Sequence, residues 1–96
     1  MRNLKSEKQL AFEKHTLAHV DALYRLGMTL TGDAKAADDL IQETYLKAYR
    51  SWDKYGHVTN IRTWLFRILR NSFINVYRKG ATELMVNNIR EDGLLL

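Results

Sequence analysis

The sequence has 96 residues, a net charge of +4 and neither cysteine nor proline, so we expect one small domain without disulfides or a thiolate metal site. No apolar run approaches the roughly 20 residues needed to cross a bilayer, and Met1 to Gln9 is too charged for a signal peptide. These features exclude membrane insertion and predict a cytoplasmic protein.

The first predicted helix runs from about Glu7 to Leu30. Apolar and small residues recur at helical spacing on one face, which we expect to be buried: Phe12, Thr16, Val20, Leu23, Leu26, Gly27 and Leu30. The segment Thr31-Gly32-Asp33 then ends the helix, because Gly32 can adopt a positive φ and Asp33 can cap the next helix.

Two further helices are predicted on either side of a loop. The second runs from about Ala34 to Trp52, with a buried stripe of Ala37, Leu40, Ile41, Thr44, Ala48 and Trp52. The loop Asp53–Asn60 comes next, and its last residue is the expected N-cap of the third helix, which extends from Ile61 to about Lys79. The expected buried residues of that helix are Ile61, Leu65, Ile68, Leu69, Ser72 and Val76.

Gly80 is the expected end of the third helix. Residues 1–80 are therefore predicted to form a compact all-α domain of three helices. Residues 81–96 contain Asn87-Asn88 and Glu91-Asp92-Gly93, which are typical of a linker or a frayed C-terminal tail, although residues 83–89 are able to form a short fourth helix.

The third helix has a basic face. Between Ile61 and Gly80 every charged residue is basic: Arg62, Arg67, Arg70, Arg78 and Lys79. Helical projection places Thr63, Arg67, Arg70, Ile74 and Arg78 opposite the buried stripe, with Phe66, Phe73 and Tyr77 on one flank and Trp64, Asn71 and Asn75 on the other. Arginines bind phosphates, aromatic rings stack on unpaired bases and amides contact base edges, so this face suits single-stranded DNA. Alternatively, the aromatic residues widen the core.

The loop before this helix contributes further candidate residues. Lys54, Tyr55, His57 and Asn60 lie beside the basic face. A polar loop in this position can hold one base that has been extruded from a duplex.

The second helix carries a different exposed surface. Its outward residues place one leucine within a rim of acids and amides: Asp38, Asp39, Gln42, Glu43, Leu46, Tyr49 and Arg50. An apolar anchor with a charged rim is typical of a protein interface, and the acids favour a basic partner. The alternative is a single exposed leucine, which soluble proteins tolerate.

No catalytic or metal-binding motif is apparent. His15 and His19 have the i, i+4 spacing of a helical zinc pair, but the glutamate of the protease motif is replaced by Thr16 and no third ligand is evident. The sequence contains no glycine-rich phosphate-binding loop, no pair of carboxylates placed for acid–base catalysis and no Ser/His/Asp pattern typical of a catalytic triad. We expect neither an enzyme nor a cofactor.

Two blocks resemble one protein family. The run from Ala36 to Tyr49, AADDLIQETYLKAY, resembles the polymerase-docking helix of the sigma-70 family, in particular its extracytoplasmic-function (ECF) group. The run RTWLFRI from Arg62 to Ile68, followed by Asn71 and Asn75, resembles that group's −10 recognition helix. The blocks occur in the family's order and at about its spacing, and the match covers roughly Phe12 to Lys79.

The resemblance implies an all-α region 2 domain and specific partners. Asp38, Asp39, Gln42, Glu43 and Leu46 would contact the coiled coil of the largest subunit of core RNA polymerase. Trp64, Arg67, Asn71 and Asn75 would contact the non-template strand of the promoter −10 element, and the loop 55–60 would hold a flipped base. An anti-sigma factor is a further implied partner. Family members also carry a helix-turn-helix domain for the −35 element, so we expect this chain to be part of a longer protein.

Two other functions are compatible with parts of the pattern. A homeodomain-like module would insert the third helix into the major groove of a duplex, but such helices favour small or polar base-reading residues over large aromatics. A purely protein-binding helical module would leave the acid-free basic helix unexplained.

Overall fold

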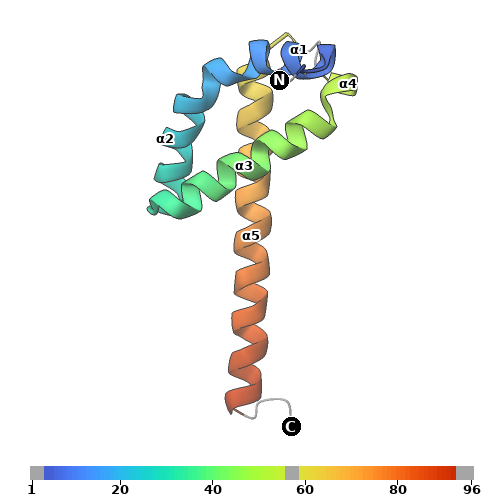
Figure 1. The fold of residues 1–96 in the computed structure, drawn as a ribbon. Helices are drawn as coiled ribbons and strands as arrows, with labels where there is room; N and C mark the ends of the chain where they lie inside the picture. Colours follow the sequence, from blue (N-terminus) through green and yellow to red (C-terminus); the bar gives the residue numbers. More distant parts are fainter. Residues whose placement is uncertain (1–3, 56–58, 93–96) are drawn as a thin grey trace.

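A computed structural model describes residues 4–55 and 59–92, with the backbone alone for residues 77–92. Its elements are α1 (Glu7–Thr16), the 3-10 helix η1 (Leu17–His19), α2 (Val20–Thr31), α3 (Ala34–Arg50), α4 (Trp52–Tyr55) and α5 (Ile61–Asp92). The described residues include no strand, and the all-α prediction is confirmed. The shorter helices gather around the first half of α5, whose second half extends beyond them (Figure 1).

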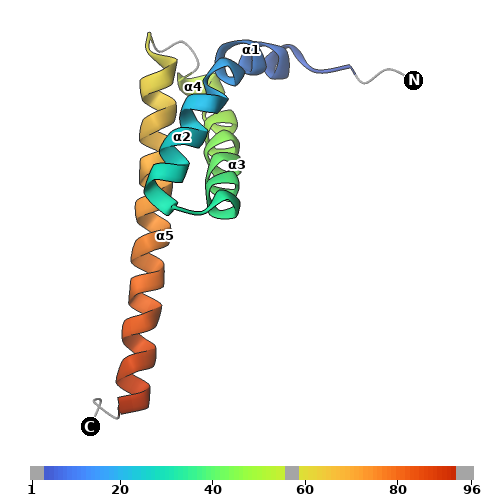
Figure 2. The same cartoon turned by 90° about the vertical axis from the view of Figure 1, so that its left-hand side faces the viewer.

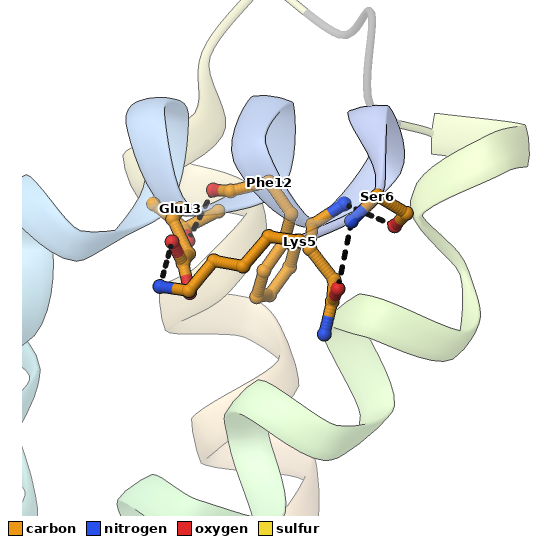
Figure 3. Close-up of polar contacts among 6 residues, drawn as sticks. Lys5, Ser6, Phe12 and Glu13 are labelled. Atoms are coloured by element: carbon orange, nitrogen blue, oxygen red, sulfur yellow. Dashed lines mark hydrogen bonds and ion pairs between the residues drawn. The ribbon is translucent and has the colours of Figure 1, made fainter. Parts of the chain in front are cut away.

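Helix α1 begins with a reciprocal capping interaction. The Ser6 hydroxyl accepts a hydrogen bond from the Gln9 amide at 3.1 Å, and the Gln9 side chain accepts one from the Ser6 amide at 3.0 Å. This capping box satisfies two amides that lack partners at a helix start. Lys5, which precedes the N-cap, forms a 2.8 Å ion pair with Glu13 of α1 (Figure 3).

The predicted continuous helix from Glu7 to Leu30 is wrong, because η1 interrupts it. The Thr16 hydroxyl donates back to the Phe12 carbonyl at 2.6 Å, a bond that often bends helices. The Tyr45 hydroxyl of α3 donates to the Thr16 carbonyl at 2.8 Å. This tertiary bond gives the carbonyl a partner outside the helix, and the chain changes direction between α1 and α2.

The turn between α2 and α3 matches the expected one. Gly32 adopts φ 68°, and the Asp33 side chain accepts a 2.8 Å hydrogen bond from the Ala36 amide. A Cβ atom added at Gly27 would lie 3.3 Å from the Cβ of Ala37, so the absence of a side chain at Gly27 lets α2 and α3 approach closely.

The ends of α3 and α5 differ from the predicted ones. Helix α3 stops at Arg50, and Trp52 begins the separate helix α4, which occupies the first part of the predicted loop. Helix α5 begins at the expected N-cap, where the Asn60 side chain accepts a 3.0 Å hydrogen bond from the Thr63 amide. The expected stop at Gly80 is wrong, because α5 continues to Asp92. A glycine inside a helix costs about 1 kcal/mol relative to alanine, which good helix formers nearby can offset.

The core lies where α1, α2, α3 and α4 meet the first half of α5. Its buried apolar cluster consists of Phe12, Leu23, Leu40, Ala48, Trp52, Leu65 and Leu69. The buried hydroxyls of Thr16, Thr44 and Ser72 all have hydrogen-bond partners, so the core contains no unsatisfied side-chain group among the described residues. Val76 was expected to be buried but is 67% exposed, because the other helices do not extend that far along α5.

Candidate nucleic-acid interface and docking surface

The outer face of α5 contains an open groove between two rows of side chains. Residues within each row are four apart, so the rows follow the ridges of the helix. One row consists of Arg62, Phe66, Arg70 and Ile74, and the other of Thr63, Arg67 and Asn71. We call this feature the basic groove; its volume is about 470 Å³. The predicted outward orientation of Thr63, Arg67, Arg70 and Ile74 is confirmed.

The three arginines of the basic groove are available to bind an anionic ligand. Within the part of the chain whose side chains are described, none of them forms an ion pair, whereas Lys5, Lys8, Lys35 and Lys47 each pair with a carboxylate. The Arg62 guanidinium lies 5.3 Å from the centre of the Phe66 ring, a cation–π geometry that orders both side chains. A groove lined by three arginines and no acid suits a phosphate backbone.

Trp64 lies between the core and the surface. It is half-buried, and its ring centre is 6.2 Å from that of buried Trp52 and 6.3 Å from that of exposed Tyr55. Phe66 and Phe73 are also half-buried, and of these two only Phe66 lines the basic groove. These three rings pack against the core and remain partly exposed, so they widen the core and also contribute to the surface of α5.

The remaining predicted DNA contacts differ in their surroundings. Asn71 and Asn75 are exposed, and Asn71 lines the basic groove. The Lys54 ammonium lies 5.3 Å from the Tyr55 ring centre, beside Trp64. Asn60 uses its side-chain oxygen to cap α5. His57 and the side chains of Tyr77, Arg78 and Lys79 lie outside the described residues.

The exposed side of α3 carries most of the residues predicted to contact a protein. Leu46 is 53% exposed, and four of its polar neighbours are also exposed: Asp38, Asp39, Gln42 and Arg50. We call these residues, together with Glu43, the α3 docking face. Glu43 is half-buried and lies 3.6 Å from Lys47, whose ammonium donates to Ser72 of α5 at 2.9 Å.

Tyr49 was predicted to point outward from α3, but its side chain is more buried than that prediction implies. It is half-buried, with its ring centre 5.1 Å from that of Phe12 and 4.4 Å from the Lys8 ammonium. Lys8 also forms a 3.2 Å ion pair with Asp53 of α4. Tyr49 therefore lies where α1, α3 and α4 meet, at the edge of the α3 docking face.

The basic groove and the α3 docking face point in different directions. Leu65, Leu69 and Ser72 are buried on the inner side of α5, whereas Leu40, Thr44 and Ala48 are buried on the inner side of α3. Figure 2 shows α5 on one side of the domain and α3 on the other. Two partners can therefore occupy these surfaces at the same time.

The two histidines do not form a metal site with other described residues. The His15 ring stacks on Trp52 at 5.9 Å, and His19 belongs to η1. No group of three potential ligands occurs in the described residues. Likewise, none of the described helices is long and apolar enough to span a bilayer.

The sequence pattern did not reveal an apolar pocket between α1 and α3. We call it the α1–α3 pocket; its volume is about 280 Å³ and it is lined by Gln9, Phe12, Glu13, Leu17, Tyr45 and Tyr49. It lies beside the helix break, which brings Leu17 next to Tyr45 and Tyr49. Since neither glycine nor proline marks that break, no local signal in the sequence predicts the pocket.

Comparisons with known proteins identify one family. The model of sigma-70 region 2 matches residues 17–83. The ECF RNA polymerase sigma factor EcfG of Rhodopseudomonas palustris is 44% identical over 71% of this chain and 38% of its own length. SigM of Bacillus subtilis and SigL of Mycobacterium tuberculosis, also ECF RNA polymerase sigma factors, are each 34% identical, over 73% and 78% of this chain.

The chain spans about two fifths of the length of these relatives, between 38% and 43%. The matched region includes α2, α3, α4 and the first part of α5, and so contains the basic groove and the α3 docking face. The resemblance noted in the sequence is confirmed: the chain belongs to the sigma-70 region 2 family, in its ECF group.

Proposed function

We propose that this domain docks on core RNA polymerase through the α3 docking face and binds the non-template strand of the promoter −10 element through the basic groove. The observation that carries the proposal is the presence of both surfaces on opposite sides of one small domain. A protein that brings a polymerase to a DNA strand needs two such surfaces. The names of the relatives, all RNA polymerase sigma factors, support the same assignment.

The α3 docking face supports the polymerase part of the proposal. An exposed leucine beside carboxylates offers an apolar anchor and attracts a basic partner. The proposed partner is the coiled coil of the largest polymerase subunit, and the proposed contacts are Asp38, Asp39, Gln42, Glu43, Leu46, Tyr49 and Arg50. Because Tyr49 is half-buried, we expect its exposed edge alone to take part.

The basic groove supports the DNA part of the proposal. Arg62, Arg67 and Arg70 would contact phosphates, and the partly exposed rings of Phe66 and Trp64 would stack on unpaired bases. The further proposed contacts are Lys54, Tyr55, His57, Asn60, Asn71, Asn75, Arg78 and Lys79. The half-buried aromatic rings favour this mode over a homeodomain-like insertion, because they lie beside the groove where a major-groove helix needs small or polar side chains.

The proposal also covers the location of the protein, a further partner and the boundaries of the domain. We propose a cytoplasmic protein that has no enzymatic activity of its own, with an anti-sigma factor as an additional partner. Residues 1–80 would form the interacting domain. Residues 81–96 would lead away from it, and the continuation of α5 to Asp92 makes most of this linker helical.

Docking can be tested by changing the α3 docking face. In the double variant Leu46→Asp, Glu43→Lys, a charge replaces the apolar anchor and one rim charge is reversed. We expect the affinity for core polymerase to fall by at least about 30-fold, as for loss of an interface hot spot. The helical circular dichroism should be unchanged, because Leu46 is 53% exposed and the Glu43–Lys47 pair is weak at the surface.

Arg25→Asp provides a matched control. Arg25 is exposed on α2 and belongs to neither surface, so its charge reversal should leave polymerase binding unchanged. Unchanged affinity of the double variant, or an equal loss in the control, would contradict docking through α3.

A further inference from the structure

Helix α3 crosses α5 (Figure 1), and the side chain of Lys47 joins the two helices. Its ammonium donates a 2.9 Å hydrogen bond to the Ser72 hydroxyl of α5, and it lies 3.6 Å from the Glu43 carboxylate of α3. Lys47 lines neither the basic groove nor the α1–α3 pocket. The hydrogen bond that it forms therefore connects parts of the domain with each other.

Ser72 is the last buried residue along α5 within the part whose side chains are described. The buried residues before it are Leu65 and Leu69, and the side chains after it are half-buried or exposed, with Val76 67% exposed. Apolar packing is non-directional, whereas a hydrogen bond weakens steeply when its angle departs from the optimum. The bond from Lys47 to Ser72 therefore restrains the rotation of α5 about its own axis, at the point where the helix leaves the domain.

The direction of Asn71 depends on this rotation. Asn71 precedes Ser72, is exposed and lines the basic groove. Consecutive residues of a helix point about 100° apart, so a restraint on Ser72 also fixes the direction of Asn71. An amide recognises a base edge through well-aligned hydrogen bonds, whereas phosphate binding by arginine is largely electrostatic. A small rotation of α5 would therefore impair base recognition more than phosphate binding.

We propose that Lys47 is a positioning residue for base recognition: by holding Ser72, it fixes the rotation of α5 that presents Asn71 to an unpaired base. This inference rests on the proposed function. It adds a residue of α3 that belongs to neither the α3 docking face nor the basic groove. The serine interrupts an otherwise apolar buried row of α5, and a satisfied polar pair specifies the arrangement of two helices more narrowly than apolar packing does.

The test measures discrimination between bases by the complete chain in complex with core polymerase. The probes are non-template −10 strands in which each base in turn is replaced by the other three, with all affinities measured at one salt concentration. Asn71→Ala identifies the position that Asn71 reads. Lys47→Met keeps the length of the side chain without the ammonium and should reduce discrimination at that same position at least about fivefold. Ser72→Ala, which removes the acceptor and keeps Lys47, should do the same.

The double variant Lys47→Met, Asn71→Ala separates positioning from a merely structural role. If Lys47 acts through Asn71, the double variant discriminates at this position as Asn71→Ala does, because both changes remove the same interaction. The slope of log affinity against log salt concentration should stay that of the unchanged chain, since the arginines remain. Equal losses of affinity for every strand, or losses that add in the double variant, would overturn the inference.

Lys35→Met is the matched control. Lys35 forms the same kind of i, i+4 pair, with Asp39 at 3.5 Å, but it is exposed near the start of α3 and forms no hydrogen bond with α5 in the described residues. This variant should discriminate between bases as the unchanged chain does. A loss equal to that of Lys47→Met would count against a specific role of the bond to Ser72 and overturn the inference.

The outcomes also distinguish this inference from the proposed function. If the unchanged complex binds the −10 strand no more tightly than the duplex, the proposed function is wrong and the inference falls with it. If the strand is preferred but Lys47→Met and Ser72→Ala keep full discrimination, strand binding stands and the positioning role is overturned. If Asn71→Ala alters discrimination at no position, Asn71 reads no base, and the inference is overturned while phosphate binding by the arginines stands.

Discussion

The Tyr45 hydroxyl donates a 2.8 Å hydrogen bond to the backbone carbonyl of Thr16, 29 residues earlier in the chain. This contact joins α3 to the end of α1 and accompanies the change of direction at η1. Tyr45 also forms one wall of the α1–α3 pocket. A single phenol therefore links the break in the N-terminal helix to α3, the helix that carries the α3 docking face.

The Tyr45→Phe variant tests this link directly. The substitution keeps the ring but removes the donor, so the Thr16 carbonyl loses its partner from α3. We expect the free energy of unfolding to fall by about 1 kcal/mol, measured by urea denaturation at neutral pH. Tyr24→Phe is the matched control, because Tyr24 is half-buried on α2 and forms no side-chain hydrogen bond in the described residues. An equal loss in both variants would contradict a specific role of the Tyr45 hydroxyl.

The same phenol predicts how stability changes at high pH. Burial raises the pKa of Tyr45 from 10.0 to about 12. Between these values the unfolded chain loses the Tyr45 proton while the folded chain keeps it, so stability falls as pH rises from 10 to 12. The difference in unfolding free energy between the unchanged chain and Tyr45→Phe should therefore shrink over this range. A difference that stays constant from pH 9 to pH 12 would show that the Tyr45 pKa is not raised.

The features that could be predicted from the sequence depend on local signals. Gly32 and Asp33 marked the α2–α3 turn, Asn60 marked the start of α5, and the helical spacing of Leu65, Leu69 and Ser72 identified its buried side. The outward positions of Arg67 and Arg70 likewise follow from helical spacing alone, whereas the projection did not place Arg62 on that face.

The features that could not be predicted depend on contacts between distant segments. The break at η1 involves a bond between Thr16 and Tyr45, which no local pattern can indicate. The inward position of Tyr49 results from packing against Phe12. The exposure of Val76 reflects how far the other helices extend along α5, and its helical spacing gives no information on that length.

Arginine substitutions test the contact with the DNA backbone. Arg67→Ala and Arg70→Ala each remove one unpaired guanidinium from the basic groove. Each should weaken binding to all single-stranded sequences alike and reduce the slope of log affinity against log salt concentration by about 0.7. Arg25→Ala, at an exposed position of α2 outside the groove, should change neither quantity. Unchanged slopes for both groove variants would exclude phosphate contact there.

Trp64 should matter more for strand opening than for closed-complex formation. Its half-buried ring packs against Trp52 and Tyr55 and remains partly exposed to solvent. In holoenzyme reconstituted with this protein, Trp64→Ala should reduce permanganate reactivity of −10 thymines at matched promoter occupancy. Base stacking contributes about 1–3 kcal/mol per base. Intact reactivity would assign Trp64 to the core alone.

The central claim is that the domain, docked on polymerase, holds a single DNA strand in the basic groove. The most direct measurement is the affinity of the domain–core polymerase complex for a labelled non-template −10 strand and for the duplex of the same sequence, at one salt concentration. We predict tighter binding of the single strand, and loss of this preference when Arg67 and Arg70 are both replaced by alanine. Duplex binding as tight as single-strand binding, or a preference unaffected by the two substitutions, would contradict the account.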